Sequence, residues 1–209
     1  MPARTFFAAL AAILCLAAAP PGRNAFAAPA HTQEDSDLQY IREEEKVARD
    51  SYITFNDLWG LAVFANIMDS EQRHMNAVLA LLEKYGLPDP AAGKGVGVFT
   101  NPALQKLYDT LTALGSGNAS SALQVGGLIE ETDIQDITAA IGRARHEDIV
   151  KTYETLMCGS RNHLRSFAEL VAKSAGQPYK AQVLPQDQVN KIIASPMEQC
   201  GNGNRQKPE

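Results

Sequence analysis

Apolar residues recur every three or four positions along most of the chain, and this spacing predicts α-helices with one buried face. Ser36 suits the N-cap of a first helix over residues 37–58, which Gly60 ends. A second helix is expected over residues 62–85, because Gly86 and two nearby prolines stop the periodic pattern there. The first part of the fold is therefore predicted to be a helical hairpin.

Residues 86–101 contain several prolines and glycines and show little periodicity, so they are predicted to form a long connection. An N-cap asparagine followed by proline then marks the start of a short helix over residues 102–114. Two more long helices are expected over residues 120–143 and 147–175. This order predicts an all-α fold over residues 37–175, a ferritin-like four-helix bundle with one long crossover that carries the short helix.

Residues 1–30 are expected to be a signal peptide that is removed from the mature protein. Arg4 precedes an apolar run over residues 6–19, which is too short to span a bilayer comfortably. Two small-x-small cleavage sites follow, Ala25-Phe26-Ala27 and Ala28-Pro29-Ala30. The predicted location is therefore the periplasm or the outside of the cell, with roughly 180 residues in the mature chain.

Residues 176–209 form a C-terminal tail, which is expected to pack on the bundle through scattered apolar residues and a short helix near residues 187–194. The end of the tail, from Gly201 onward, is predicted to be disordered. Cys158 and Cys200 remain in the mature chain, and export permits a disulfide between them. The sequence leaves open whether they pair.

Net charge limits the partners of the protein. The chain carries a formal charge of −5, which becomes −7 when Arg4 and Arg23 leave with the signal peptide. This charge disfavours nucleic acids and anionic membranes. No later segment is apolar over a membrane-spanning length. The sequence leaves open whether the mature chain is a monomer or a homodimer.

The second helix carries the sharpest chemical signal. Glu71 and His74 lie on the same apolar stripe as Ile67 and Val78, because positions three or four apart share one face of a helix. A buried carboxylate is costly unless it is paired or bound to a cation. Glu-x-x-His on a bundle helix is the half-motif of carboxylate-bridged di-iron sites. A buried hydrogen bond between the two side chains is the alternative explanation.

The first helix also directs an acid towards the core. Glu45 lies on its apolar stripe, Glu44 is one residue off the stripe and can flank the same site, and Glu43 is expected outside it. A solvated acidic first turn, which suits the helix dipole, is the alternative for these three glutamates.

The third and fourth helices complete the pattern. Glu130 and Asp133 share a face with apolar residues of the third helix, whereas Glu131 is expected at the edge or outside. His163 lies at the centre of the apolar stripe of the fourth helix. A single histidine on such a face is more often a core residue than a ligand. Three other helices, however, direct acids or a second histidine at the same core, and buried acids need a cation at neutral pH.

These motifs resemble the ferritin-like superfamily, and in particular its rubrerythrin-like branch. Glu45-x-x-Ala48-x-x-x-Tyr52, Glu71-x-x-His74 and Glu130-x-x-Asp133 are similar to the first three helix patterns of that branch. The stretches 42–50, 70–75 and 159–165 also resemble a prokaryotic ferritin-like family of unassigned function. The resemblance covers residues 37–175 and implies the fold more firmly than it implies an activity.

The chain departs from the superfamily pattern on the fourth helix, where Ser160-x-x-His163 replaces Glu-x-x-His. Asp133 or Glu44 can replace the missing carboxylate; otherwise the site holds one metal, or two with an open position. The sequence has no pair of Cys-x-x-Cys motifs, so no built-in rubredoxin-like iron centre is expected.

The predicted ligands are Glu45, Glu71, His74, Glu130 and His163, with Asp133 as the substitute acid. Their mixture of carboxylate and imidazole favours iron, with manganese next. We therefore expect redox chemistry, either oxidation of ferrous iron or reduction of peroxide or oxygen. Nearby Tyr52 and Tyr153 are interpreted as core aromatics, or else as hydrogen-bonding or radical-quenching groups. The alternative functions are metal binding without turnover and a structural bundle whose acids and histidines satisfy each other.

Overall fold

The computed structural model describes residues 32–201, and within that range the chain forms six α-helices and no β-strand. The predicted signal peptide and the last residues, 202–209, lie outside the described part. None of the described helices is long and apolar enough to span a membrane. The helices are α1 (Gln33–Trp59), α2 (Ala62–Tyr85), α3 (Pro102–Gly115), α4 (Ala119–Arg143), α5 (Glu147–Ala175) and α6 (Gln186–Ala194). The all-α prediction is confirmed.

The start of α1 differs from the prediction. The helix begins at Gln33, and its N-cap is Thr32 instead of Ser36. The Thr32 hydroxyl accepts a hydrogen bond from the backbone N–H of Asp35, whose carboxylate accepts one from the N–H of Thr32 (3.1 and 2.8 Å). This reciprocal capping box satisfies two backbone donors that the helix leaves free, so it is preferred over a single serine cap.

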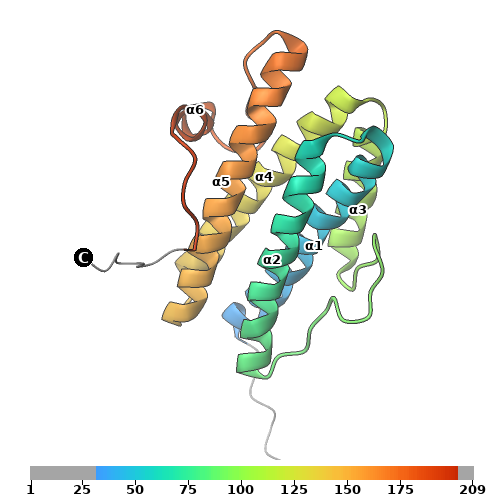
Figure 1. The fold of residues 1–209 in the computed structure, drawn as a ribbon. Coiled ribbons are helices and arrows are strands. Elements are labelled where there is room, and N and C mark those ends of the chain that lie inside the picture. The colour runs from blue at the N-terminus through green and yellow to red at the C-terminus, as the bar shows by residue number, and fades with distance from the viewer. Residues whose placement is uncertain (1–31, 202–209) are drawn as a thin grey trace, which may run out of the picture. The chain divides into compact units, whose positions relative to one another are not determined.

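Four long helices form a bundle of two hairpins, α1–α2 and α4–α5 (Figure 1). α1 packs against α4, and α2 packs against α5. At one end of the bundle, Arg143 of α4 pairs with Asp37 of α1 (2.8 Å), while the Tyr85 hydroxyl of α2 donates to Asp148 of α5 (2.8 Å). α4 therefore runs antiparallel to α1 and parallel to α2. Such an order requires a long connection, and the predicted single crossover that carries α3 is confirmed.

Buried charged residues of α1 bind the crossover through hydrogen bonds. The carboxylate of Glu43 accepts hydrogen bonds from the backbone N–H groups of Thr100 and Asn101 (2.5 and 2.9 Å). A buried ion pair between Lys46 and Asp50 contacts the same connection. The expectation that Glu43 points outside is wrong, because the crossover returns over that face of α1 and leaves the residue 2% exposed.

A layer of polar side chains divides the core at the middle of the bundle. On α2, Glu71 and His74 separate Ile67, which belongs to an aromatic-rich cluster, from Val78 of a second apolar cluster. The other helices are interrupted at the same level, by Glu44 and Glu45 on α1, Glu130 and Asp133 on α4, and Ser160 and His163 on α5. The two apolar clusters thus fix the helices on both sides of the polar layer.

The tail folds back over α4 and buries a glutamate that was expected at the edge of this helix. The carboxylate of Glu131 accepts hydrogen bonds from the backbone N–H groups of Gln182, Val183 and Leu184 and from the Tyr179 hydroxyl, all at 2.8–3.0 Å. Glu131 is fully buried, so the prediction was wrong. A carboxylate that accepts several N–H donors can be buried without a cation.

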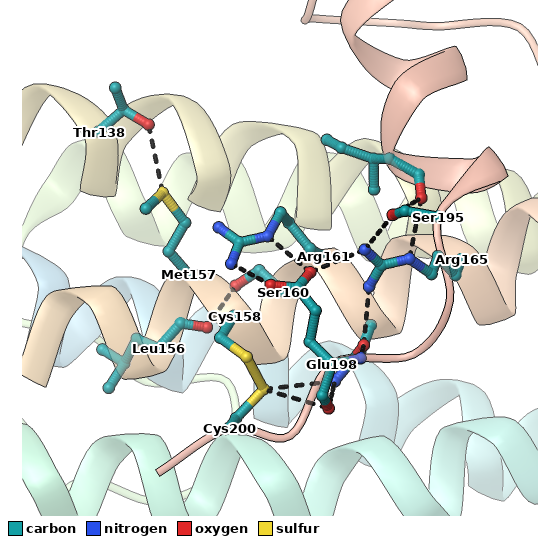
Figure 2. Close-up of polar contacts among 12 residues, drawn as sticks. Thr138, Leu156, Met157, Cys158, Ser160, Arg161, Arg165, Ser195, Glu198 and Cys200 are labelled. Carbon is teal, nitrogen blue, oxygen red and sulfur yellow. Dashed lines mark hydrogen bonds and ion pairs between the residues drawn. A yellow bond between two sulfur atoms is a disulfide. The ribbon is translucent and has the colours of Figure 1, made fainter. Parts of the chain in front are cut away.

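The end of the tail is attached to the outer face of α5 (Figure 2). Cys158 and Cys200 form a disulfide, which answers the question that the sequence left open. Arg161 and Arg165 of α5 both bind the carboxylate of Glu198. The tail is therefore held by a covalent bond and by charged hydrogen bonds within a few residues of it.

Candidate metal centre

Glu71 of α2 lies between two histidines in the polar layer. Its Oε2 atom is 2.7 Å from Nδ1 of His74, and its Oε1 atom is 2.8 Å from Nδ1 of His163. His74 lies one turn further along α2, whereas His163 is contributed by α5. The two imidazole rings are stacked, with their centroids 5.8 Å apart. Each oxygen of one carboxylate therefore faces a different imidazole.

Two further glutamates flank this arrangement. Oε2 of Glu45, on α1, is 3.1 Å from Nδ1 of His74, and Oε2 of Glu130, on α4, is 3.4 Å from Nδ1 of His163. The result is two overlapping groups, Glu45–Glu71–His74 and Glu71–Glu130–His163, in each of which the potential ligand atoms lie within 4.8 Å of one another. Atoms at such spacing can surround one cation with bonds of about 2.0–2.2 Å. Each group can therefore hold a metal ion.

Nδ1 of His74 is hydrogen-bonded to Oε2 of Glu45 (3.1 Å), but most of the other potential ligand atoms lack such a partner. Both oxygens of Glu71, Oε2 of Glu130 and Nδ1 of His163 are buried, and none has a partner in hydrogen-bond geometry among the described residues. The same atoms nevertheless lie 2.7–3.4 Å from their neighbours. Buried polar atoms normally form hydrogen bonds, and a shared cation could satisfy these converging atoms. Carboxylate oxygen and imidazole nitrogen are suitable ligands for first-row divalent metals.

Asp133, the predicted substitute acid, is buried beside these groups but belongs to neither of them. It is 2% exposed, and its Oδ2 atom has no hydrogen-bond partner among the described residues. Burial raises the pKa of Asp133 well above its usual range, and the carboxylates of Glu45, Glu44 and Glu130 raise it further. Glu44 is also buried with both oxygens unpartnered. Burial likewise raises the pKa of Glu44 well above its usual range. Both acids therefore favour the uncharged form, and both lie outside the two candidate groups.

The charged groups of the cluster shift one another's pKa values. Burial by itself would raise the pKa of Glu71, but the imidazoles of His163 and His74 outweigh it and hold that pKa below its usual range. Burial lowers the pKa of His163, but the Glu71 and Glu130 carboxylates prevail and raise it to about 10. For Glu45, burial is the largest influence and raises the pKa to about 8. A bound cation would displace the histidine protons, because metal ligands must be deprotonated.

Small residues of α5 leave room beside the histidines. Gly159 lies so close to His74 that a Cβ atom there would be 2.5 Å from Nε2 of the ring. Ser160 occupies the position that the di-iron half-motif gives to glutamate, and its hydroxyl donates to the Leu156 carbonyl (3.3 Å) instead of joining the cluster. Gly159 was not among the residues predicted to form the site. A glycine inside a long helix costs about 1 kcal/mol relative to alanine, and this cost is the signal that could have revealed it.

The two tyrosines of the stripes have different surroundings. The Tyr52 hydroxyl donates to Oε1 of Glu130, so it holds a candidate ligand in place. The Tyr153 hydroxyl has no partner among the described residues, and its ring belongs to the second apolar cluster. Tyr52 is therefore a hydrogen-bond partner of the centre, whereas Tyr153 is a core aromatic.

The fold and the site define an all-α bundle whose buried carboxylate and histidine groups can hold metal. The chain belongs to the family described as "Uncharacterized protein domain (DUF2202)", whose model matches residues 34–196. It is 43% identical over 174 residues to "Uncharacterized protein MJ0754" of Methanocaldococcus jannaschii, which covers 83% of this chain and 94% of that protein. It also resembles the crystal structure of hypothetical protein MJ0754 from Methanococcus jannaschii, with a TM-score of 0.78 and 41% identity over 87% of this chain and 100% of that one. These names state no activity, so the function has to be inferred from the site.

Proposed function

We propose that this protein is an exported, ferritin-like metalloprotein that oxidises ferrous iron or reduces peroxide or oxygen. Iron is the preferred metal and manganese the second choice. The observation that carries the proposal is the position of Glu71, whose two oxygens face the Nδ1 atoms of two different histidines. A carboxylate placed in this way can bridge two cations, and Glu45 and Glu130 each provide an outer ligand.

The charge of the centre supports two divalent cations. Glu45, Glu71 and Glu130 provide three negative charges when ionised, and both histidines are neutral when they bind metal. One divalent cation neutralises only two of these charges, and the acids Asp133 and Glu44 are buried beside them. A single cation would leave a net negative charge in a region from which water is largely excluded, and this is costly.

The residues around the centre determine what it can do. A pair of bound ferrous ions would supply two electrons, one from each ion, to oxygen or peroxide. The Tyr52 hydroxyl orients Glu130, and the apolar clusters above and below limit access of water. The histidines are each 8% exposed and are the most accessible of the five ligands, so a small oxidant can approach from their side. The Ser160 hydroxyl is hydrogen-bonded to the Leu156 carbonyl, so this residue provides no carboxylate to the centre.

Export is part of the proposal and is supported by the basic, apolar and alanine-rich segments at the N-terminus. Intact-mass analysis of protein from its native host is the test. A chain shortened by about 27 to 30 residues supports export. A chain that still starts near Met1 would overturn it.

The metal centre is tested by anaerobic titration with ferrous iron, followed by measurement of oxygen and peroxide consumption. The wild type should bind two iron ions per chain and consume both oxidants. Glu71→Gln should abolish binding at both positions, because it removes a charge from the shared carboxylate. Glu154→Gln is the matched control, since Glu154 is exposed on α5 and lies outside both groups. A wild type that binds neither iron nor manganese would overturn the proposal.

A structural bundle is the second candidate, and one observation favours it. The histidines lie at ion-pair distance from Glu71, so protonated imidazoles can neutralise part of the buried charge without metal. A protein that binds iron but consumes no oxidant would instead be a storage or buffering module. The titration therefore separates the three functions.

A further inference from the structure

Cys158 of the disulfide and His163 of the candidate metal centre lie five residues apart on α5, less than two turns of the helix. Cys158 is followed directly by Gly159, which packs against the imidazoles. A Cβ atom at Gly159 would be 2.5 Å from Nε2 of His74 and 3.8 Å from Cε1 of His163. The residue that follows Cys158 in the helix therefore faces both candidate ligands, with His74 the nearer.

The tail is held in place independently of the disulfide. Glu198, two residues before Cys200, binds Arg161 and Arg165 through its carboxylate (Figure 2). Its backbone N–H donates to Oδ1 of Asn162, and its carbonyl accepts from Nδ2 of the same side chain (2.8 and 2.9 Å). Breaking the sulfur–sulfur bond would therefore leave Cys200 beside Cys158 at a high effective concentration. A disulfide that is reduced and re-formed repeatedly needs its two thiols to stay close together in the reduced state.

The disulfide can also be reached from solvent. A surface depression of about 280 Å³ is lined by both cysteines together with Lys151, Glu154 and Gln199. Cys200 is partly exposed, whereas Cys158 is buried. An external thiolate can therefore attack the sulfur of Cys200 and release Cys158 as the leaving thiolate.

We propose that Cys158 and Cys200 are a redox-active pair that supplies two electrons for peroxide reduction at the neighbouring centre, an inference that rests on the proposed function. The two thiols lose two electrons and two protons and form the sulfur–sulfur bond. Hydrogen peroxide accepts them, its oxygen–oxygen bond breaks, and two water molecules form. An external thiol then restores the dithiol by exchange. The sequence contains no rubredoxin-like cysteine motif, so this pair is the electron source that the chain itself contains.

The experiment starts from protein whose disulfide has been reduced and whose reductant has been removed under anaerobic conditions. The protein is loaded with ferrous iron and treated with hydrogen peroxide, and free thiols are counted by alkylation and intact mass. The iron-loaded wild type should lose both thiols as one disulfide. Metal-free wild type should lose them at least about tenfold more slowly, because only direct oxidation by peroxide remains. Glu71→Gln that has been mixed with the same amount of iron and then freed of unbound iron should be equally slow.

A double variant, Cys158→Ser with Cys200→Ser, tests the electron count. It should bind iron like the wild type but consume one peroxide fewer per chain, whereas a purely structural disulfide would leave peroxide consumption unchanged. Equal rates of thiol loss in the wild type and Glu71→Gln would overturn the inference. The two ferrous ions can themselves reduce one peroxide per chain. Consumption of a second peroxide with both thiols intact would overturn the inference but leave the proposed function standing. Failure of the wild type to bind iron would overturn both this inference and the proposed function.

Discussion

At the scale of single residues, Gly159 determines how closely α5 approaches the histidine of α2. Gly159→Ala would place a Cβ atom 2.5 Å from the His74 ring, so the imidazole or the helix must move. We expect metal affinity to fall by about 10–100-fold, as for other groups that orient a ligand. Titration with ferrous iron or manganese, together with thermal unfolding, measures the effect.

Gly142→Ala is the matched control for this substitution. Gly142 lies in α4, and a Cβ atom there would have no other atom within 4 Å. Alanine should stabilise the helix by about 0.5–1 kcal/mol and leave metal affinity unchanged. Unchanged affinity in Gly159→Ala would show that His74 is not held as a ligand at this position.

A second prediction at the residue scale concerns Tyr52, whose hydroxyl donates a hydrogen bond to Glu130. Tyr52→Phe keeps the ring, which packs against Phe64 and Phe167, and removes only this donor. Metal affinity should fall by about 10–100-fold while the helix content stays the same. The binding isotherm and the circular dichroism spectrum test the two parts. A loss of helix content would instead show that Tyr52 stabilises the fold and does not act specifically on the ligand Glu130.

At the scale of elements, the attachment of the tail to α5 depends on pH through Glu198. The hydrogen bond from Arg161 is the main cause that lowers the Glu198 pKa from 4.5 to about 2, with Arg165 adding to it against the effect of burial. A lowered pKa means that this contact stabilises the folded state above pH 4.5 and that the stabilisation is lost as the pH falls towards 2.

Glu198→Gln should therefore be less stable than the wild type at neutral pH, and the difference should shrink as the pH is lowered from about 5 towards 2. Urea unfolding of both proteins across this range measures the difference, with the disulfide intact in each. Parallel stability curves would show that Glu198 contributes no pH-dependent stability.

At the scale of the whole molecule, the acids of the polar layer should make stability depend on metal. They come from α1, α2 and α4 and meet only in the folded protein, so a cation that binds only the folded protein must raise the melting temperature. The gain should be about 2.7 kcal/mol at a metal concentration ~100 times the dissociation constant. Melting curves with iron, with manganese and with a chelator measure this gain.

Glu71→Gln should lose the gain, and Glu154→Gln should keep it. Glu43 is unsuitable as a control, because it is hydrogen-bonded to the crossover and its loss would destabilise the fold by itself. Equal melting temperatures in iron, manganese and chelator would favour the structural bundle and remove the basis for redox chemistry.

The sequence by itself determined the helices and most of the polar layer, because both follow from local geometry. Gly60, Gly86 and Gly176 end three of the helices in the left-handed conformation, with φ of 62–66°, and no distant contact is needed to specify it. Glu71 and His74 could be assigned to the core because the period of a helix fixes which residues share its apolar face. The same period identified Glu45, Glu130 and His163, which the structure brings to the same layer.

Only the tertiary structure decided which other polar residues are buried and what they bind. Glu43 and Glu131 lie off the apolar stripes, yet both are buried because the crossover and the tail return over them with free N–H groups. Asp133 lies on its stripe but remains outside both ligand groups, since helix packing fixes where each carboxylate ends. The position of Gly159 against His74 likewise depends on how α2 and α5 approach each other. Helix periodicity specifies a direction within one element, whereas these contacts depend on the paths of chain segments that are distant in sequence.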